Sequence, residues 1–320
     1  MTTKTTQTPL ASNLAENQSL YTTLNELVET RFHVKHRSLG SQQKVMQQAS
    51  GGHQSLRKGS GMTFSEVRQY QPGDDIRHID WRVTARTQKA HTKVFTEEHE
   101  KAVLLVAEQT PALFFGTQVQ LKASQVLNVA ALLGWCTLGQ NDLIGGMVFN
   151  SEQQAWVAPK RQQQTLLSWF NKALLLQHTL QQPGTANPLY WQQACQQLVK
   201  VVKPGSKLFL IGDLLNLNEI TLNYLKTVRK HSEITAIHIY DPLEKSLPKL
   251  GWLSLTASWA SSNLLPINSL KSETRKRYHD QYEQAWQTAK QNFMGMRVPL
   301  VEISTADSAL SVLIAQRIVK

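Results

Sequence analysis

The sequence is poor in cysteine and lacks any long hydrophobic run. Its 320 residues include two cysteines, Cys136 and Cys195, and both lie within apolar helical patterns, so we expect buried thiols rather than a disulfide. No run of about 18 apolar residues is present, and the first residues lack the apolar core of a signal peptide. No zinc-ligand spacing occurs either. These absences predict a cytoplasmic protein without a membrane span or a disulfide framework.

Motifs of common enzymes are also missing. No Gly-Lys-Ser or Gly-Lys-Thr follows Gly145-Gly146, so this pair predicts close backbone packing rather than a phosphate loop. No Gly-x-Ser-x-Gly nucleophile elbow is present. His91 and His99 lack a second histidine and an acid at ligand spacing. The sequence therefore gives no direct signal for a nucleotide-binding or hydrolytic centre.

Negative charge is scarce relative to positive charge. The formal net charge is +11 and the pI is near 9.6, which invites a nucleic-acid interpretation. The basic residues are scattered, however, and the tightest basic cluster, around Lys271 and Arg275, shares its helix with Glu273, Asp280 and Glu283. A solvated basic surface, or one that faces an acidic partner, explains the charge better. Nucleic-acid binding stays an alternative.

Apolar residues make up 41% of the chain, which is enough for a substantial core. Continuous apolar runs at residues 102–107, 143–149, 207–212 and 233–240 are typical of buried strands. Helical patterns at residues 120–138, 162–176, 191–202, 219–230, 272–294 and 308–318 alternate with them. This alternation predicts an α/β fold with a mostly parallel sheet and helices on both faces. We expect residues 102–107 to form a central strand, flanked by the strands that begin at Lys207 and Glu233.

The densest stretch of the sequence is residues 59–87. Residues 63–70 alternate as a strand, residues 72–75 have turn chemistry, and residues 78–84 predict a returning strand. Four arginines and four acids lie in this short space, which predicts a network of guanidinium–carboxylate pairs. The arginines are Arg68, Arg77, Arg82 and Arg86, and the acids are Glu66, Asp74, Asp75 and Asp80. Such a network would be structural, or would present a rigid surface to a partner.

A long pattern in this stretch resembles the signature of a known family. The pattern is Arg68-x-Tyr70-x-Pro72-Gly73-Asp74-Asp75-x-Arg77-x-Ile79-Asp80-Trp81, then Thr84-Ala85-Arg86-Thr87 and Glu97-Glu98-x-Glu100. It is similar to that of the bacterial domain-of-unknown-function fifty-eight family, and Asp241-Pro242-x-Glu244 resembles a further segment of it. The resemblance implies a small β subdomain joined to a von Willebrand factor A-like domain of Rossmann type. It also implies a MoxR-type AAA ATPase, commonly encoded beside members of the family, as partner.

Four segments follow from this resemblance and from the patterns. Residues 1–19 are expected to be a disordered tail, and residues 20–58 an N-terminal helix with a linker arm. Residues 59–100 are expected to form the β subdomain, and residues 101–320 the von Willebrand A-like domain. Many relatives carry transmembrane helices, so we expect this chain to reach a membrane only through partners.

The resemblance also implies a metal site. In a von Willebrand A-like domain, Asp-x-Ser-x-Ser after the first strand holds Mg²⁺ together with a threonine and an aspartate from later loops. The matching positions here are Glu108, Thr110 and Ala112, with Asp213 as the later aspartate and Thr185 as the threonine. Glutamate is one methylene longer than aspartate and alanine offers no oxygen, so we expect a degenerate site that binds Mg²⁺ weakly. The double change Glu108→Asp with Ala112→Ser would restore the pattern, and we expect it to create measurable affinity for Mn²⁺.

The sequence thus favours a non-enzymatic protein-interaction module, an adaptor or scaffold partner of a MoxR-type AAA ATPase, without a cofactor. A Mg²⁺-dependent hydrolase that uses Asp74, Asp75, His78 and Asp80, or Asp213, is an alternative. The four nearby arginines argue against a metal at the first of these groups. We therefore expect Arg68 and Asp80 to be structural, as part of an interaction network that includes Tyr70 and Trp81. Asp80→Ala should then lower the melting temperature clearly, because it leaves a buried charge unpaired.

Overall fold

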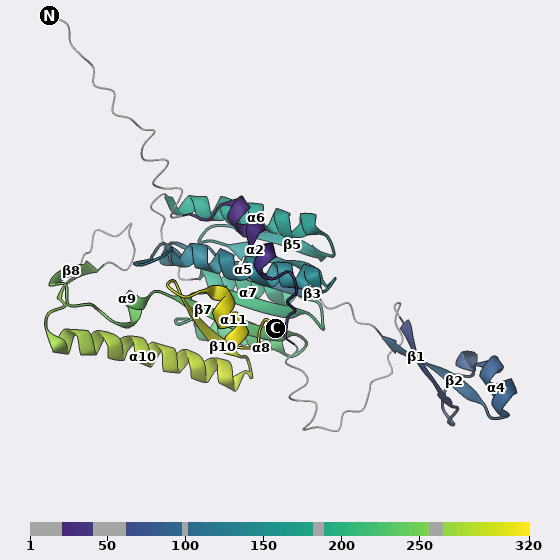
Figure 1. The fold of residues 1–320 in the computed structure, drawn as a ribbon. Helices are drawn as coiled ribbons and strands as arrows, with labels where there is room; N and C mark the ends of the chain where they lie inside the picture. Colours follow the sequence, from purple (N-terminus) through teal and green to yellow (C-terminus); the bar gives the residue numbers. More distant parts are fainter. Residues whose placement is uncertain (1–20, 41–61, 98–101, 182–188, 256–264) are drawn as a thin grey trace, which may run out of the picture. The chain divides into compact units, whose positions relative to one another are not determined.

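The computed structural model describes residues 21–40, 62–97, 102–181, 189–255 and 265–320. The chain splits into two compact units (Figure 1). One, the sheet domain, combines Met1–Ser41 with Lys101–Lys320, and the other, the signature unit, is Gln42–Glu100. The signature unit is thus an insertion in the sheet domain. The tail expected at residues 1–19 and the linker arm at residues 41–58 lie outside the described residues.

The sheet domain is built on six strands in the order β10-β7-β6-β3-β4-β5. All neighbours are parallel except β5, which pairs antiparallel with β4. The mixed α/β architecture with a mostly parallel sheet is therefore confirmed. The strands are β3 (Ala102–Glu108), β4 (Leu143–Phe149), β5 (Gln154–Lys160), β6 (Lys207–Gly212), β7 (Glu233–Tyr240) and β10 (Leu300–Ser304).

The central position of β3 is confirmed, and one of its two expected neighbours is wrong. β6 does pair with β3, but the other neighbour is β4, and β7 pairs with β6 instead. Strand β4 follows β3 through a single helix, and such consecutive parallel strands are usually adjacent in space. The correction leaves β3 buried along its whole length.

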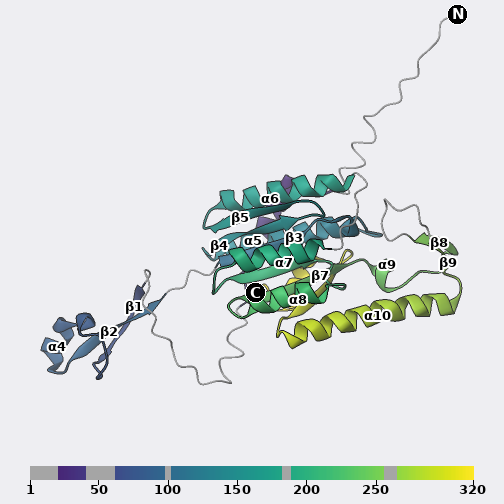
Figure 2. The ribbon, with the colours of Figure 1, turned by 180° about the vertical axis from the view of Figure 1, so that it is seen from behind.

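The continuous apolar run of β3 supplies two separate cores, because successive side chains point to opposite faces. Val103, Leu105 and Ala107 belong to one core, and Leu104 and Val106 belong to the other. The first core is covered by α2 (Leu24–His33), α5 (Lys122–Gly139), α6 (Gln163–His178) and α11 (Ala309–Ala315), as Figure 1 shows. The second is covered by α7 (Tyr190–Val201), α8 (Glu219–Arg229) and the end of α10 (Ser272–Gly295), which Figure 2 shows from behind.

Close packing explains two further features of this domain. Cys136 and Cys195 are buried free thiols, as expected. A Cβ atom on Gly146 would overlap the main chain of Leu105 on the neighbouring strand, so the Gly145-Gly146 pair does serve close backbone approach. No helix in the described part of the chain is long and apolar enough to cross a membrane.

Short elements complete the sheet domain. They are the 3-10 turns η2 (Pro111–Leu113) and η3 (Thr179–Gln181), the helix α9 (Pro242–Lys245) and the antiparallel pair β8 (Trp252–Leu255) and β9 (Leu265–Asn268). The last described residues of the domain's first segment also pair with its C-terminal residues. Ser38 and Lys320 exchange main-chain hydrogen bonds in both directions, at 3.1 and 2.8 Å, and Leu39 forms a bridge with Val319.

The signature unit consists of β1 (Met62–Gln69) paired antiparallel with β2 (His91–Glu97), with η1 (Ile76–His78) and α4 (Trp81–Thr87) between them. The predicted returning strand at residues 78–84 is wrong. The Asp80 carboxylate accepts hydrogen bonds from the backbone N–H groups of Arg82 and Val83, both at 3.1 Å, and this cap starts a helix. The strand that pairs with β1 begins only at His91.

Candidate functional site

Three acidic residues follow or end neighbouring strands at one edge of the sheet. Glu108 is the last residue of β3, Asp213 follows β6, and Asp241 follows β7. The carboxyl ends of parallel strands share an edge, and this edge is where open α/β sheets bind ligands. The backbone N–H of Asp213 donates to Glu108 Oε2 at 2.8 Å, so the expected pair does come together. Thr185, the expected threonine, lies outside the described residues.

Glu108 is fully buried and bonded on both carboxylate oxygens. Oε1 accepts from the Thr110 hydroxyl, and Oε2 accepts from Trp191 Nε1 at 3.0 Å as well as from the Asp213 amide. Burial raises the pKa of Glu108 to about 7, helped by the charge of Asp213, while the donors act in the opposite direction. A Cβ atom on Gly212 would collide with the Glu108 side chain. The glutamate therefore needs glycine at the end of β6.

A buried lysine lies at the centre of this edge. Lys122, the first residue of α5, has no exposed side-chain surface, and its Nζ is 2.9 Å from both Asp213 Oδ2 and Glu244 Oε1. Burial opposes the charge, but these two carboxylates hold the pKa of Lys122 above its usual value. Burial would raise the pKa of Asp213, yet Lys122 and His238 lower it to about 2. Lys122 is thus a charged, fully enclosed ammonium group.

Two further residues fix the carboxylates around Lys122. The buried His238 on β7 accepts a hydrogen bond at Nδ1 from the backbone N–H of Leu214, at 3.2 Å. Burial lowers the pKa of His238 to about 4, so its imidazole is neutral at physiological pH. Asp241 and Glu244 form a capping box at the start of α9, in which the Asp241 N–H donates to Glu244 Oε2 at 2.9 Å. Asp241 itself accepts from the hydroxyls of Thr117 and Thr305.

These residues do not fit a divalent cation. Mg²⁺ needs an octahedral shell of oxygens at about 2.0–2.1 Å, but both oxygens of Glu108 already accept hydrogen bonds within the chain. The Lys122 ammonium lies between Asp213 and Glu244 and would repel a metal ion there. The side chain of Ala112, within η2, brings no oxygen. Among the described residues, no group of three or more His, Cys, Asp or Glu side chains is arranged to hold a metal.

The charged residues of the signature unit are more exposed to solvent than the predicted network of guanidinium–carboxylate pairs would be. Arg68 pairs with Asp74 at 2.7 Å, and Asp80 pairs with Lys93, not with an arginine, at 3.6 Å among the described residues. Asp75 and Asp80 accept hydrogen bonds from backbone N–H groups and so begin η1 and α4. Arg77, Arg82 and Arg86 are exposed, and Tyr70 is half-buried. Trp81 is 70% exposed and Ile76 is 66% exposed.

A family model described as "Protein of unknown function DUF58" matches residues 66–288. The chain belongs to the DUF58 family. The DUF58 match begins within β1 and ends within α10. It includes the signature residues from Glu66 and also Lys122 with its partners Asp213 and Glu244, which we call the Lys122 cluster. Lys122 and Glu244 were missed as site residues by the sequence patterns. A lysine in the first turn of an otherwise apolar helix, and the Asp241-Pro242-x-Glu244 segment, were the available signals.

Relatives of this DUF58 protein include uncharacterized proteins of Mycobacterium bovis and Mycobacterium tuberculosis. Each is 28% identical over 207 residues, which is 63% of this chain and 62% of the relative. Similar solved structures include the conserved hypothetical protein BatB from Bacteroides thetaiotaomicron, at 12% identity and a TM-score of 0.41 over 68% of this chain and 97% of that one. An aerotolerance-related membrane protein from Bacteroides fragilis has 12% identity and a TM-score of 0.35, covering 68% and 98% of the two chains.

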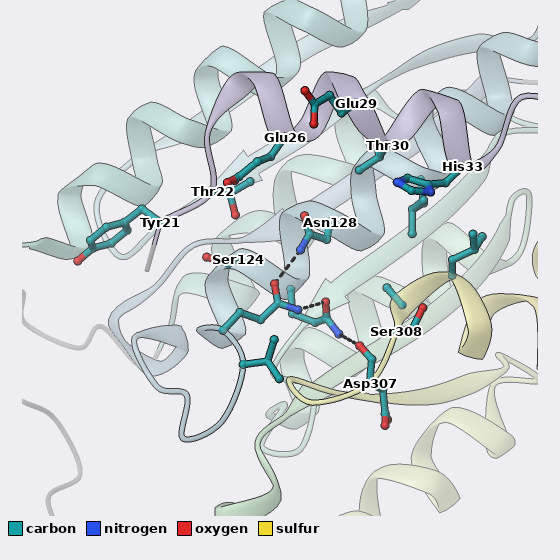
Figure 3. Close-up of a pocket in the computed structure, with 16 residues that line it drawn as sticks. Tyr21, Thr22, Glu26, Glu29, Thr30, His33, Ser124, Asn128, Asp307 and Ser308 are labelled. Carbon is teal, nitrogen blue, oxygen red and sulfur yellow. Dashed lines mark hydrogen bonds between the residues drawn. The ribbon is translucent and has the colours of Figure 1, made fainter. Parts of the chain in front are cut away.

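A cleft of about 520 Å³ lies between α2, α5 and the loop before α11 (Figure 3). Its wall contains a directional chain of amides, in which Asn128 donates to Gln120, Gln120 to Gln125, and Gln125 to the carbonyl oxygens of Ser304 and Asp307. These donors are therefore used within the wall. Only the α5 side of the cleft falls inside the DUF58 match.

Proposed function

We propose that this DUF58 protein is a non-enzymatic protein-interaction module whose signature unit provides the contact surface. The observation that carries the proposal is the exposure of Trp81 and Ile76, at 70% and 66%, within the stretch of highest motif density. Large exposed apolar side chains that gather in one short segment are a feature of binding sites. The Asp80 cap fixes the backbone that presents Trp81.

The surroundings of Trp81 suit a particular kind of partner surface. Arg77, Arg82 and Arg86 are exposed in the same short segment. Tryptophan and arginine are the residues most enriched at the energetic centres of interfaces. A complementary partner would offer an apolar pocket for the indole ring and carboxylates around it. The net charge of +11 also favours an acidic partner.

The finer fold assignment, a von Willebrand A-like domain, is part of the proposal. Its support is the meeting of Glu108 and Asp213 at the carboxyl edge of the sheet, at the positions that match that domain's metal loop. The alternative of a Mg²⁺-dependent hydrolase has less support. Asp74 pairs with Arg68, and Asp80 caps α4, and these structural contacts support the non-enzymatic proposal.

The proposed partner is a MoxR-type AAA ATPase, on the basis of the family resemblance, and the proposed location is the cytoplasm, where ATP is available. The test is binding between the purified full chain and a MoxR-type ATPase from the same organism, with ATP, with ADP and without nucleotide. Trp81→Ala should weaken the complex by at least about tenfold, because loss of a central aromatic anchor typically has this effect.

A matched control is available in the sheet domain. Trp252 on β8 is 73% exposed, so Trp252→Ala removes a tryptophan of closely similar exposure outside the signature unit. We expect its affinity for the ATPase to stay within about twofold of wild type. Equal affinities for wild type and Trp81→Ala would contradict the proposed surface. No complex in any nucleotide state would contradict the partner.

A further inference from the structure

Lys122 joins three separate parts of the sheet domain at one point. Its own position is the first turn of α5, Asp213 is in the segment after β6, and Glu244 is in α9 after β7. We propose that Lys122 is a resident cation that takes the place of a divalent metal ion at this edge, so that the edge is held together without metal.

The surroundings of Lys122 would destabilise its positive charge if no carboxylate were near. The side chain is completely removed from water, which penalises an ammonium ion by several kcal/mol. It also lies at the N-terminus of an 18-residue helix, where the helix dipole repels positive charge. Two carboxylates at 2.9 Å offset both effects. An ammonium group held in this way links its neighbours as a bound metal ion would.

The same arrangement explains why glutamate stands at position 108. The longer side chain reaches across Gly212 and accepts a hydrogen bond from the backbone N–H of Asp213. The Trp191 N–H donates to the same carboxylate oxygen. Glu108 thus positions the Asp213 segment, and Lys122 supplies the positive charge. An aspartate is one bond shorter and would not reach this amide without movement of the main chain.

The Lys122 ammonium also reverses the expectation that the double variant at positions 108 and 112 binds Mn²⁺. The double change Glu108→Asp with Ala112→Ser shortens one carboxylate and adds one hydroxyl oxygen, but it leaves the Lys122 ammonium between Asp213 and Glu244. We therefore expect that double variant to bind no Mn²⁺. Removal of Lys122 is the change that opens the space between the two carboxylates.

The experiment measures melting temperature of the purified full chain and of Lys122→Ala, alone and with Mn²⁺, with propylammonium, or with 1-propanol. Lys122→Ala removes the atoms that propylammonium replaces, and 1-propanol is a neutral molecule of similar size. We expect Lys122→Ala to melt at least about 6 °C below wild type, because it leaves two partly buried carboxylates without their shared cation and empties the space of a fully buried side chain. Propylammonium or Mn²⁺ should restore part of this loss, whereas 1-propanol should not.

Two further variants keep the test decisive. Lys245→Ala removes another lysine of the same edge, one that is 30% exposed and paired with Glu302, and neither cation should raise its melting temperature more than that of wild type. Lys122→Met fills the space without charge, so its melting temperature still tests the proposal if Lys122→Ala fails to fold.

Three results would overturn the proposal. The first is a Lys122→Met variant as stable as wild type, which would mean that Lys122 acts only by packing. The second is a Lys122→Ala variant that folds but regains no stability with either cation. The third is Mn²⁺ binding by the wild type, measured by calorimetry, that disappears in Asp213→Asn. All measurements use the chain alone, so they are independent of partner binding.

Discussion

The Lys122 cluster and the signature unit use the same kinds of charged residue in opposite ways. At the sheet edge, Lys122 is enclosed, and the carboxylates of Asp213 and Glu244 both contact it at 2.9 Å. In the signature unit, Arg77, Arg82 and Arg86 are exposed. The difference teaches that charge density in a sequence does not locate the buried charges, because the dense stretch exposes its arginines while the enclosed ion pairs join residues far apart in the sequence. We propose that the enclosed set holds the sheet domain together and that the open set contacts a partner.

The sharpest way to test this comparison is to break one ion pair in each region. Asp213→Ala leaves the enclosed Lys122 with one carboxylate, and we expect it to lower the free energy of unfolding by about 3 kcal/mol. Urea unfolding followed by tryptophan fluorescence measures this. Arg68→Met removes the partly exposed pair with Asp74, and its melting temperature should stay within about 2 °C of wild type. Similar losses in both variants would remove the distinction.

A second pair of variants tests how tightly the sheet edge is packed. Gly212→Ala places a Cβ atom against the Glu108 side chain and 3.1 Å from the Trp191 ring, so we expect a loss of about 1–3 kcal/mol. Gly139→Ala, at the end of α5, meets no atom within 4 Å and should be neutral or slightly stabilising. Thermal unfolding of the two proteins gives the difference directly. A tolerated Gly212→Ala would mean that Glu108 can move aside.

A third pair separates a hydrogen bond from packing. Trp191 and Trp169 are both buried, and the Trp191 N–H donates to Glu108 at 3.0 Å, whereas the Trp169 N–H has no partner among the described residues. Trp191→Phe should be about 1–2 kcal/mol more destabilising than Trp169→Phe, because it leaves a buried carboxylate short of one donor. Chemical denaturation of both variants measures the difference. Equal losses would mean that the indole N–H contributes nothing to the Glu108 site.

The smallest expected effect concerns the signature unit itself. Asp80→Ala removes the cap of α4, and amide hydrogen exchange at Arg82 and Val83 should become several-fold faster. Asp80→Asn keeps a capping oxygen and should exchange almost as slowly as wild type. The melting temperature of the sheet domain should not change in either variant, which revises the larger effect expected from a buried ion network. Unchanged exchange in Asp80→Ala would show that α4 does not depend on its cap.

The overall fold was readable from the sequence because its strands are continuous apolar runs. Residues 102–107 and 207–212 predict buried parallel strands, and the structure has β3 and β6 there. Strand order was only partly predictable, since nothing in the run at residues 233–240 distinguishes a neighbour of β3 from a neighbour of β6. Adjacency depends on which helix crosses which face, and this is a property of the assembled domain.

The candidate site was less predictable, for a physical reason. The partners of Lys122 are 91 and 122 residues away in the sequence, so no local pattern connects them. The prediction for the signature unit was wrong for a different reason. Ile79, Trp81 and Val83 alternate as a strand would, but Asp80 caps a helix that begins at Trp81. A single capping residue decided the local structure against the alternation of apolar residues.

Because the signature unit is inserted in the sheet domain, a protein bound to the signature unit would also be tethered to the sheet domain. The chain enters the insertion just after Leu39 and Gly40, which pair with the C-terminal residues Val319 and Ile318, and it leaves the insertion just before the central strand β3. Both ends are therefore anchored in the same folded body. A protein bound at Trp81 would therefore be tethered to the sheet domain through two covalent connections instead of one. A second contact with the sheet domain would then be an intramolecular step, and its occupancy would depend on the effective concentration that these connections set.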